Sequence, residues 1–163
     1  MQQAQMQFER DSFVLALTNP GGGFQGFLDI IENYKGTKAS NLAHYYAGVS
    51  YLNLGQYDAA IDYLKDFKPS GQVLPIMKFG ALGDAHSEKE EFDKAMGFYK
   101  KAASANANEA ITPYYLKKIG LLHERNANWT EAEKVYRQIK DKYPDSPDGR
   151  DIEKYIIRVQ AKG

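Results

Sequence analysis

The sequence predicts an all-α protein in which a helix-turn-helix unit occurs three times in succession. Three observations support this fold class. Apolar residues recur at helical spacing through most of the chain, short turns rich in glycine, asparagine or proline interrupt them, and a set of small and aromatic residues returns at a period near 35 residues. The chain has 163 residues, of which 43% are hydrophobic, and this suits a single folded domain, residues 1–163, with a core of its own.

The repeat is clearest at three glycines, Gly48, Gly83 and Gly120, which are 35 and 37 residues apart. An alanine stands twelve residues after each glycine. An aromatic residue stands three residues before each alanine, and a bulky residue stands four residues after the same alanine. The alanines are Ala60, Ala95 and Ala132, the aromatic residues are Tyr57, Phe92 and Trp129, and the bulky residues are Leu64, Tyr99 and Tyr136. Small residues let two helix backbones approach while bulky ones fill the space beside them. We therefore expect helices to touch at the glycine and alanine positions.

This pattern resembles the tetratricopeptide repeat, a helix-turn-helix unit of about 34 residues. The resemblance rests on Gly48, Tyr51, Gly55, Tyr57, Ala60 and Leu64 in the first clear copy, on Gly83, Phe92, Ala95, Tyr99 and Ala102 in the second, and on Gly120, Trp129, Ala132, Tyr136 and Pro144 in the third. It implies a right-handed superhelical solenoid with repeats at 41–70, 76–108 and 113–146. Residues 3–36 would form a degenerate leading repeat, and residues 147–161 a C-terminal capping helix.

The flanking elements are predicted from local signals. Helical spacing indicates one helix from Gln3 to about Leu17 and a second from Phe24 to Tyr34, as an antiparallel pair. Ser146 and Pro147 can begin the capping helix, whose apolar stripe contains Ile152, Tyr155, Ile156 and Val159. Thr130 and Glu133 have the spacing of a capping box, and residues 106–108 are expected to form a turn between repeats.

Composition excludes several function classes. The 21 basic and 21 acidic residues balance, so no overall field favours nucleic acid or an anionic membrane, and we expect neither as a partner. The chain has no cysteine, which excludes disulfides, thiolate metal sites and a cysteine nucleophile. No apolar run reaches the length of a membrane span. We predict no catalytic residue, cofactor or metal site, and we expect a protein or peptide partner.

The three histidines are the residues most able to contradict that expectation, because histidine is a common general base and metal ligand. His86 and His123 occupy the repeat slot that usually holds tyrosine, and His44 lies early in the first helix of its repeat. Neither His86 nor His123 belongs to a His-Glu-x-x-His arrangement. Packing explains all three, and a metal-dependent enzyme that uses His86 or His123 is kept as an unfavoured alternative.

The resemblance implies a non-enzymatic scaffold that presents a concave groove, lined by the first helix of each repeat, to a peptide or protein. The matching positions are Leu42, Tyr45, Val49, Leu52 and Asn53, then Met77, Asp84, Ser87 and Glu88, then Tyr114, Lys117, Leu121, Glu124 and Arg125. Members that clamp a C-terminal carboxylate carry several basic residues there, whereas the clamp positions here hold Tyr45, Val49, Ala81, Tyr114 and Lys118. A carboxylate clamp is therefore disfavoured. The same face could instead form a homodimer, so a homo-oligomerisation module is the second alternative.

The location of the protein is predicted only from the resemblance. The sequence of the copies, such as Asn41-Leu-Ala-His-Tyr-Tyr-Ala-Gly48, is similar to that of the soluble part of membrane-anchored bacterial envelope proteins of this family. If the chain is a fragment of such a protein, an upstream anchor would place it at the periplasmic face of the inner membrane, with a role in envelope assembly or protein export. Otherwise we expect it in the cytoplasm.

Overall fold

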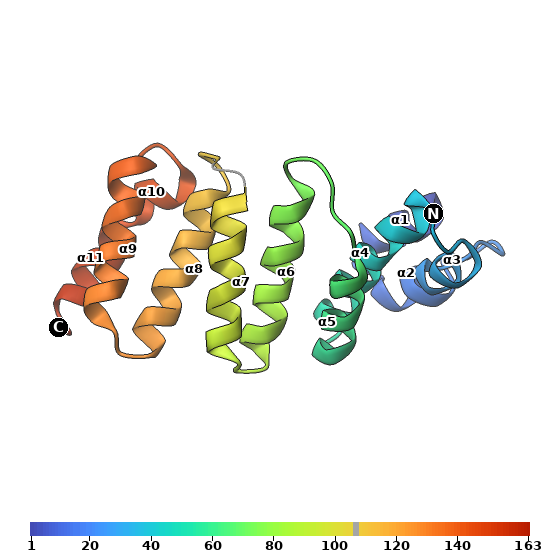
Figure 1. Ribbon diagram of the computed structural model, residues 1–163, viewed down its shortest axis with the longest axis horizontal. Coiled ribbons are helices and arrows are strands. Elements are labelled where there is room, and N and C mark those ends of the chain that lie inside the picture. Colours follow the sequence, from blue (N-terminus) through green and yellow to red (C-terminus); the bar gives the residue numbers. More distant parts are fainter. Residues whose placement is uncertain (106–107) are drawn as a thin grey trace. The chain divides into compact units, whose positions relative to one another are not determined.

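The computed structural model describes residues 1–105 and 108–163, and in these residues it has eleven helices and no strand (Figure 1). The all-α fold class is confirmed. By their contacts the residues form two compact units. The first unit contains Met1–Ser70 and Asp84–Glu91, and the second contains Gly71–Gly83 and Phe92–Gly163. The turn predicted at residues 106–108 lies largely outside the described residues.

The N-terminal part of the first unit has three short helices where two were predicted. They are α1 (Gln2–Phe8), α2 (Phe13–Thr18) and α3 (Phe27–Asn33). The prediction of one helix over residues 3–17 is wrong because the chain turns after Phe8. Asp11 adopts a left-handed conformation with φ 56°, and the amide of Ser12 donates to the carbonyl of Gln7 at 2.9 Å, which closes the end of α1.

The third helix begins at Phe27, three residues later than predicted. The carboxylate of Asp29 accepts a hydrogen bond from the amide of Gly26 at 3.3 Å, which satisfies one donor at the helix start. Gly26 is required there, since a Cβ atom would lie 2.2 Å from the carbonyl oxygen of Leu17. Phe24, which was expected on this helix, lies in the preceding loop and is 56% exposed.

Aromatic packing holds these helices against α4 (Lys38–Asn53). The rings of Phe27 and Tyr46 are stacked with centroids 5.1 Å apart, and Phe8 contacts both rings edge-on at 6.4 and 5.0 Å. Gln5 donates to the hydroxyl of Tyr46 at 3.0 Å. Buried alanines of α1, α2 and α4 surround this cluster, so the first unit has its own core.

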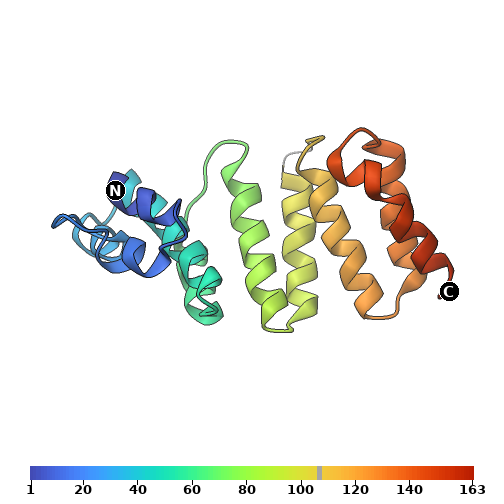
Figure 2. The same cartoon turned by 180° about the vertical axis from the view of Figure 1, so that it is seen from behind.

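The helix pairs of the three repeats are present. α4 pairs with α5 (Tyr57–Asp66), α6 (Leu74–Glu88) is followed by α7 (Phe92–Ala105), and α8 (Thr112–Arg125) pairs with α9 (Trp129–Lys142). In the second unit, α7, α8 and α9 lie side by side (Figures 1 and 2). α6 contributes residues to both units.

The two helices of each pair approach each other closely at the glycine slot. A Cβ atom on Gly48 would lie 2.6 Å from Leu64, one on Gly83 would lie 2.4 Å from Tyr99, and one on Gly120 would lie 2.2 Å from Tyr136. The alanines Ala60, Ala95 and Ala132 are fully buried. The prediction that helices touch at these positions is therefore confirmed.

The turns inside the three pairs share one backbone geometry. Gly55, Glu90 and Ala127 occupy the same slot, with φ of 73°, 59° and 55°. In each turn the next amide donates back to the carbonyl of the residue five positions earlier, at 2.8–2.9 Å, which is the Schellman arrangement. Only the first copy has the glycine that this conformation favours, so a single-sequence search for glycine finds one turn of three.

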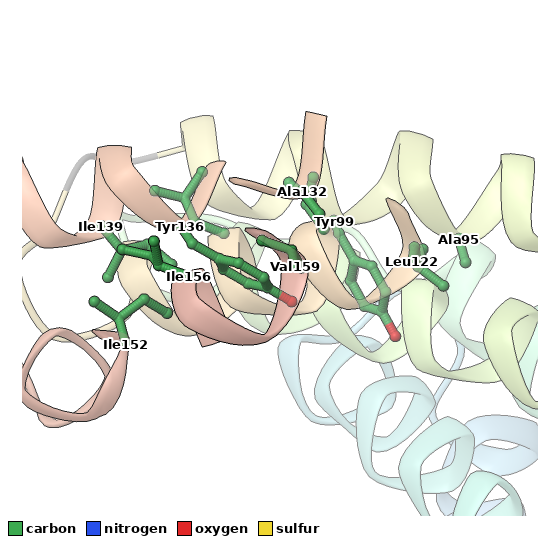
Figure 3. Packing of buried hydrophobic residues seen from close by; sticks show 11 residues of the cluster. Ala95, Tyr99, Leu122, Ala132, Tyr136, Ile139, Ile152, Ile156 and Val159 are labelled. Carbon is green, nitrogen blue, oxygen red and sulfur yellow. The ribbon is translucent and has the colours of Figure 1, made fainter. Parts of the chain in front are cut away.

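The C-terminal segment consists of two helices, α10 (Pro147–Asp151) and α11 (Glu153–Gln160), where one was predicted. The hydroxyl of Ser146 accepts from the amide of Gly149 at 2.9 Å, which confirms the predicted cap. Figure 3 shows Ile152, Ile156 and Val159 packed beside Tyr136 and Ile139 of α9. These three residues are almost fully buried, so this segment covers the apolar face of the last helix pair.

The predicted capping box at the start of α9 is wrong. The helix begins at Trp129 with Asn128 as the N-cap residue, and no side chain caps it. Glu133 accepts instead from Arg137 at 2.9 Å and from Gln160 at 2.8 Å. The spacing of Thr130 and Glu133 fits the motif, but the helix starts one residue before Thr130.

Candidate functional site

In the first unit, the predicted binding residues of α4 share one helix face but are mostly packed. Leu42, Tyr45, Val49 and Leu52 are half-buried, and only Asn53 is exposed. The ring of Tyr45 lies 5.4 Å from that of Phe67, and burial, with a smaller effect of Tyr46, raises the pKa of Tyr45 to about 12. Tyr45 is thus a neutral packing residue at physiological pH, and little apolar surface remains on this face.

The predicted residues Asp84, Ser87 and Glu88 belong to the first unit as well. The hydroxyl of Tyr57, at the start of α5, donates to Glu88 at 3.4 Å. Immediately after α6, Lys89 forms an ion pair with Asp58 of α5. Polar contacts therefore join the end of α6 to the beginning of α5.

In the second unit, the predicted apolar residues are exposed. Met77 of α6 is 38% exposed, and Tyr114 and Leu121 of α8 are 41% and 38% exposed. Tyr114 and Leu121 are seven residues apart, so they lie on one face of α8. Of the predicted anchor residues, these three offer apolar surface to a partner.

The charged residues predicted on α8 already have contacts within the second unit. Lys117 forms an ion pair with Asp148 of α10. The guanidinium of Arg125 lies 4.2 Å from the ring centroid of Phe92. These contacts hold the charged groups in place at the edges of the apolar face.

Glu124 is a structural residue. Its Oε1 atom accepts hydrogen bonds from the hydroxyl of Tyr136 and from Arg158, both at 2.5 Å. Burial, and then the adjacent carboxylate, raises the pKa of Tyr136, so its hydroxyl stays protonated and donates. Because Arg158 lies on α11, this carboxylate joins α8, α9 and α11.

The histidines are held by local contacts. Nδ1 of His44 lies 2.8 Å from the carbonyl oxygen of Ser40, one turn earlier on the same helix. Nδ1 of His86 lies 2.5 Å from a carboxylate oxygen of Glu91. Within residues 1–105 and 108–163, no group of three or more histidine, aspartate and glutamate side chains is placed to hold a metal ion. His86 belongs to the first unit and His123 to the second.

His123 differs from the equivalent residues of the other repeats. Tyr51 stacks on Tyr63 with centroids 5.3 Å apart, and His86 has Glu91. The Nδ1 atom of His123 is buried and has no hydrogen-bond partner among the residues that the structure describes. Asn128 stands where the second repeat has Glu91, so the third repeat lacks the carboxylate that could accept from a charged ring.

We expect the second unit to lose stability as the pH falls below about 6.5, which is the usual pKa of a histidine side chain. Burial lowers the pKa of His123, while Glu131 opposes this effect and Lys100 adds to it. The stabilising contribution of the neutral ring is therefore present above about pH 6.5 and is lost as the pH falls through the lowered folded-state pKa. Urea unfolding followed by the fluorescence of Trp129, the sole tryptophan, should show this loss between pH 7.5 and 5. His123→Tyr should remove it, and an equal loss in that variant would assign the effect to other groups.

Two surface features of the first unit were missed by the sequence analysis. Val14 and Leu15 of α2 are 57% and 47% exposed, although their spacing suggested a packed helix. A pocket of about 360 Å³ lies between α4 and the end of α5, and its lining includes Thr37, His44 and Asp66. Neither feature has a signal in the sequence, because exposure depends on how the short helices pack.

Comparison with known proteins identifies the repeated unit. One model of the tetratricopeptide repeat matches residues 42–68 and 118–146, and a second model of the same repeat matches residues 79–109. Together the matches cover more than half of the chain, and each begins in the first helix of a pair, α4, α6 or α8, and ends two to four residues after the second helix, α5, α7 or α9. No curated protein and no solved structure shows a significant match. Among the described residues, no helix combines the length and the apolar character needed to cross a bilayer.

Proposed function

Because the chain belongs to the tetratricopeptide repeat family, we propose that it is a non-enzymatic scaffold that binds a peptide or protein through the exposed first-helix face of its second unit. We define this face by Met77, Tyr114, Lys117, Lys118, Leu121 and Arg125. Proteins of this repeat class bind partners on surfaces built from successive helices. A preformed surface also reduces the ordering cost of binding.

One observation carries the proposal. Among the described residues of the second unit, the large apolar residues exposed by more than a third are Val73, Met77, Tyr114, Leu121 and Ile157. Three of these five are positions that the repeat assigns to its binding face. Exposed apolar side chains that gather on one face favour an interaction site over chance exposure. The α4 face of the first unit has mainly half-buried residues and contributes less.

The finer role follows the resemblance noted in the sequence. We infer that the partner belongs to an envelope assembly or protein export system, and that the chain faces the periplasm. The support for this inference is the similarity of the repeat sequences to those of membrane-anchored envelope proteins. The full reading frame tests this: an upstream apolar segment of about 20 residues would support it, and a frame without one would oppose it.

The binding face is tested by affinity capture with paired variants. Leu121→Glu should reduce the recovery of specific partners from envelope extract by about tenfold or more, because it places a charge at the centre of a desolvated contact. Ile157→Glu is the matched control, since Ile157 lies on α11 of the same unit and is 59% exposed. Equal recovery of partners by the wild-type protein and by Leu121→Glu would refute the assignment of this face as the binding site.

Self-association through the same face is separated by sedimentation velocity. A dimer that Leu121→Glu dissociates and Ile157→Glu retains would support the homo-oligomerisation module in place of a separate partner. A monomer across the micromolar range would leave the scaffold proposal as the sole interpretation of a Leu121-dependent capture.

A further inference from the structure

Nδ1 of His123 is the one buried side-chain polar atom without a hydrogen-bond partner in the part of the chain that the structure describes. An N–H group at this atom would be buried without an acceptor, so the neutral ring carries its proton on Nε2. Acid adds a second proton, at Nδ1, and gives the ring a full positive charge. A buried charge that donates to no acceptor is costly. Proton uptake therefore favours a conformation in which the ring reaches water.

The carboxylate that could accept this proton is present in the second repeat and absent in the third. Nδ1 of His86 lies 2.5 Å from Oε2 of Glu91, five residues later. The residue five positions after His123 is Asn128. Glu91 and Asn128 each precede the second helix of their repeat, and their amides donate to the carbonyls of His86 and His123 at 2.9 and 2.8 Å. The two turns therefore share a backbone geometry and differ in this acceptor.

The charged groups of the neighbouring helices do not replace the missing carboxylate. Burial lowers the pKa of His123, and Glu131 of α9 opposes this effect while Lys100 of α7 adds to it. The side chain of Glu131 is 53% exposed, and its Oε2 atom lies 3.7 Å from Nζ of Lys134. Water and this lysine therefore screen its attraction for a charged ring.

The carboxylates nearest along α8 and on α10 are also engaged. Glu124 accepts from the hydroxyl of Tyr136 and from Arg158. Asp148 of α10 forms its ion pair with Lys117. A charged His123 thus has burial against it and no carboxylate bonded to it.

The backbone around His123 is the part of the pair that can open with the ring. The amide of Asn126 donates to the carbonyl of Leu122 at 3.2 Å, that of Ala127 to Glu124 at 2.9 Å, and that of Asn128 to His123 itself. Ala127 holds a left-handed conformation with φ 55°, which has a steric cost for a residue with a side chain. These bonds lie at a helix end, where local opening is easiest.

We propose that this turn is an acid-sensitive switch: when His123 takes up a proton, the end of α8 and the turn to α9 open locally while the rest of the second unit stays folded. Further along α9, Ile139 is fully buried, and its apolar contacts do not depend on pH. Leu121 and Arg125 lie on either side of His123, so the opening alters one end of the first-helix face. This inference concerns the conformation of the second unit and does not depend on the proposed function.

Hydrogen exchange on the full chain measures this opening amide by amide. Exchange is compared at pH 7.5 and pH 5, after correction for the intrinsic pH dependence of the exchange rate. We expect the amides of residues 126–128 to lose protection by about threefold or more in acid, and the amide of Ile139 to keep its protection. A nuclear magnetic resonance titration of the ring should show His123 taking up its proton below about pH 6.5.

Variants assign the opening to the missing carboxylate. Asn128→Glu supplies the acceptor that Glu91 provides in the second repeat, so it should abolish the acid sensitivity and raise the pH at which His123 takes up its proton. Asn126→Glu is the matched control, because it adds the same charge to the same turn at an exposed position outside this slot, and it should stay acid-sensitive. His123→Tyr should also remove the sensitivity, since tyrosine does not titrate in this range. Circular dichroism verifies that each variant is folded.

Several outcomes would overturn the inference. Protection of residues 126–128 that is the same at both pH values would remove the switch. An equal loss of protection at Ile139 would show that acid unfolds the whole unit and does not open the turn alone. Acid sensitivity that persists in Asn128→Glu would reject the missing carboxylate as its cause. If that variant does not fold, His123→Tyr still decides, because sensitivity retained there would assign the opening to other groups.

Discussion

Replacing Gly120 with alanine is expected to destabilise the second unit by about 1–3 kcal/mol. The new Cβ atom would lie 2.2 Å from Cε1 of Tyr136, whose side chain is fully buried and whose hydroxyl is bonded to Glu124. The ring cannot move away without breaking that bond, so α8 and α9 must separate. Alanine gains up to about 1 kcal/mol over glycine in a helix, and this gain is smaller than the cost of the clash.

Gly97 provides the matched control. It lies in the interior of α7, and a Cβ atom there would have no heavy atom within 4 Å among the described residues. Gly97→Ala should therefore stabilise the second unit by about 0.5–1 kcal/mol. Urea unfolding monitored at Trp129 measures both effects in the unit that contains them. A raised unfolding midpoint for Gly120→Ala would contradict the close approach of α8 and α9.

Replacing Glu124 with alanine is expected to cost the second unit about 1–3 kcal/mol, mainly because it leaves the buried hydroxyl of Tyr136 without an acceptor. The bond is charge-assisted and 2.5 Å long, which places it among the stronger hydrogen bonds. The pair with Arg158 adds less, since the Arg158 side chain is 47% exposed and solvent screens it. Glu124→Gln should cost less than Glu124→Ala, because the amide oxygen can still accept.

A double-mutant cycle isolates this bond. Tyr136→Phe removes the hydroxyl, so adding it to Glu124→Ala should recover part of the loss, with a coupling energy of about 0.5–3 kcal/mol. Glu133→Ala is a suitable control, because Glu133 bonds to Arg137 and Gln160 at the surface and does not contact Tyr136. Strictly additive losses for Glu124 and Tyr136 would show that their bond contributes nothing to stability.

The repeated helix pairs could be predicted because their signal is local and occurs three times. Each glycine, alanine and bulky residue has the same spacing in every copy, and the structure places each glycine against the bulky residue of its own copy. Close packing requires small residues at fixed positions, so the requirement is visible in sequence. Asp11 and Phe24 carry no such repeated signal, which is why the helix boundaries near them were wrong.

The candidate site was predictable in position but not in exposure. The repeat places residues of α4, α6 and α8 on binding faces, yet Tyr45 packs on Phe67 whereas Tyr114 is exposed. The same slot also holds residues with different roles: Arg125 lies over the ring of Phe92, and its counterpart Glu88 accepts a bond from Tyr57. These differences depend on partners far away in sequence, which spacing does not identify.

The sequence alone determined that the chain is an all-α repeat protein, because backbone propensity and close packing impose residue types at regular intervals. The tertiary structure decided which of the predicted residues remain available to a partner. It left Met77, Tyr114 and Leu121 exposed, and it used Glu124 and Tyr45 for internal contacts. The physical reason is that exposure and charge pairing depend on which helices cover a residue, and that is set only when distant segments pack together.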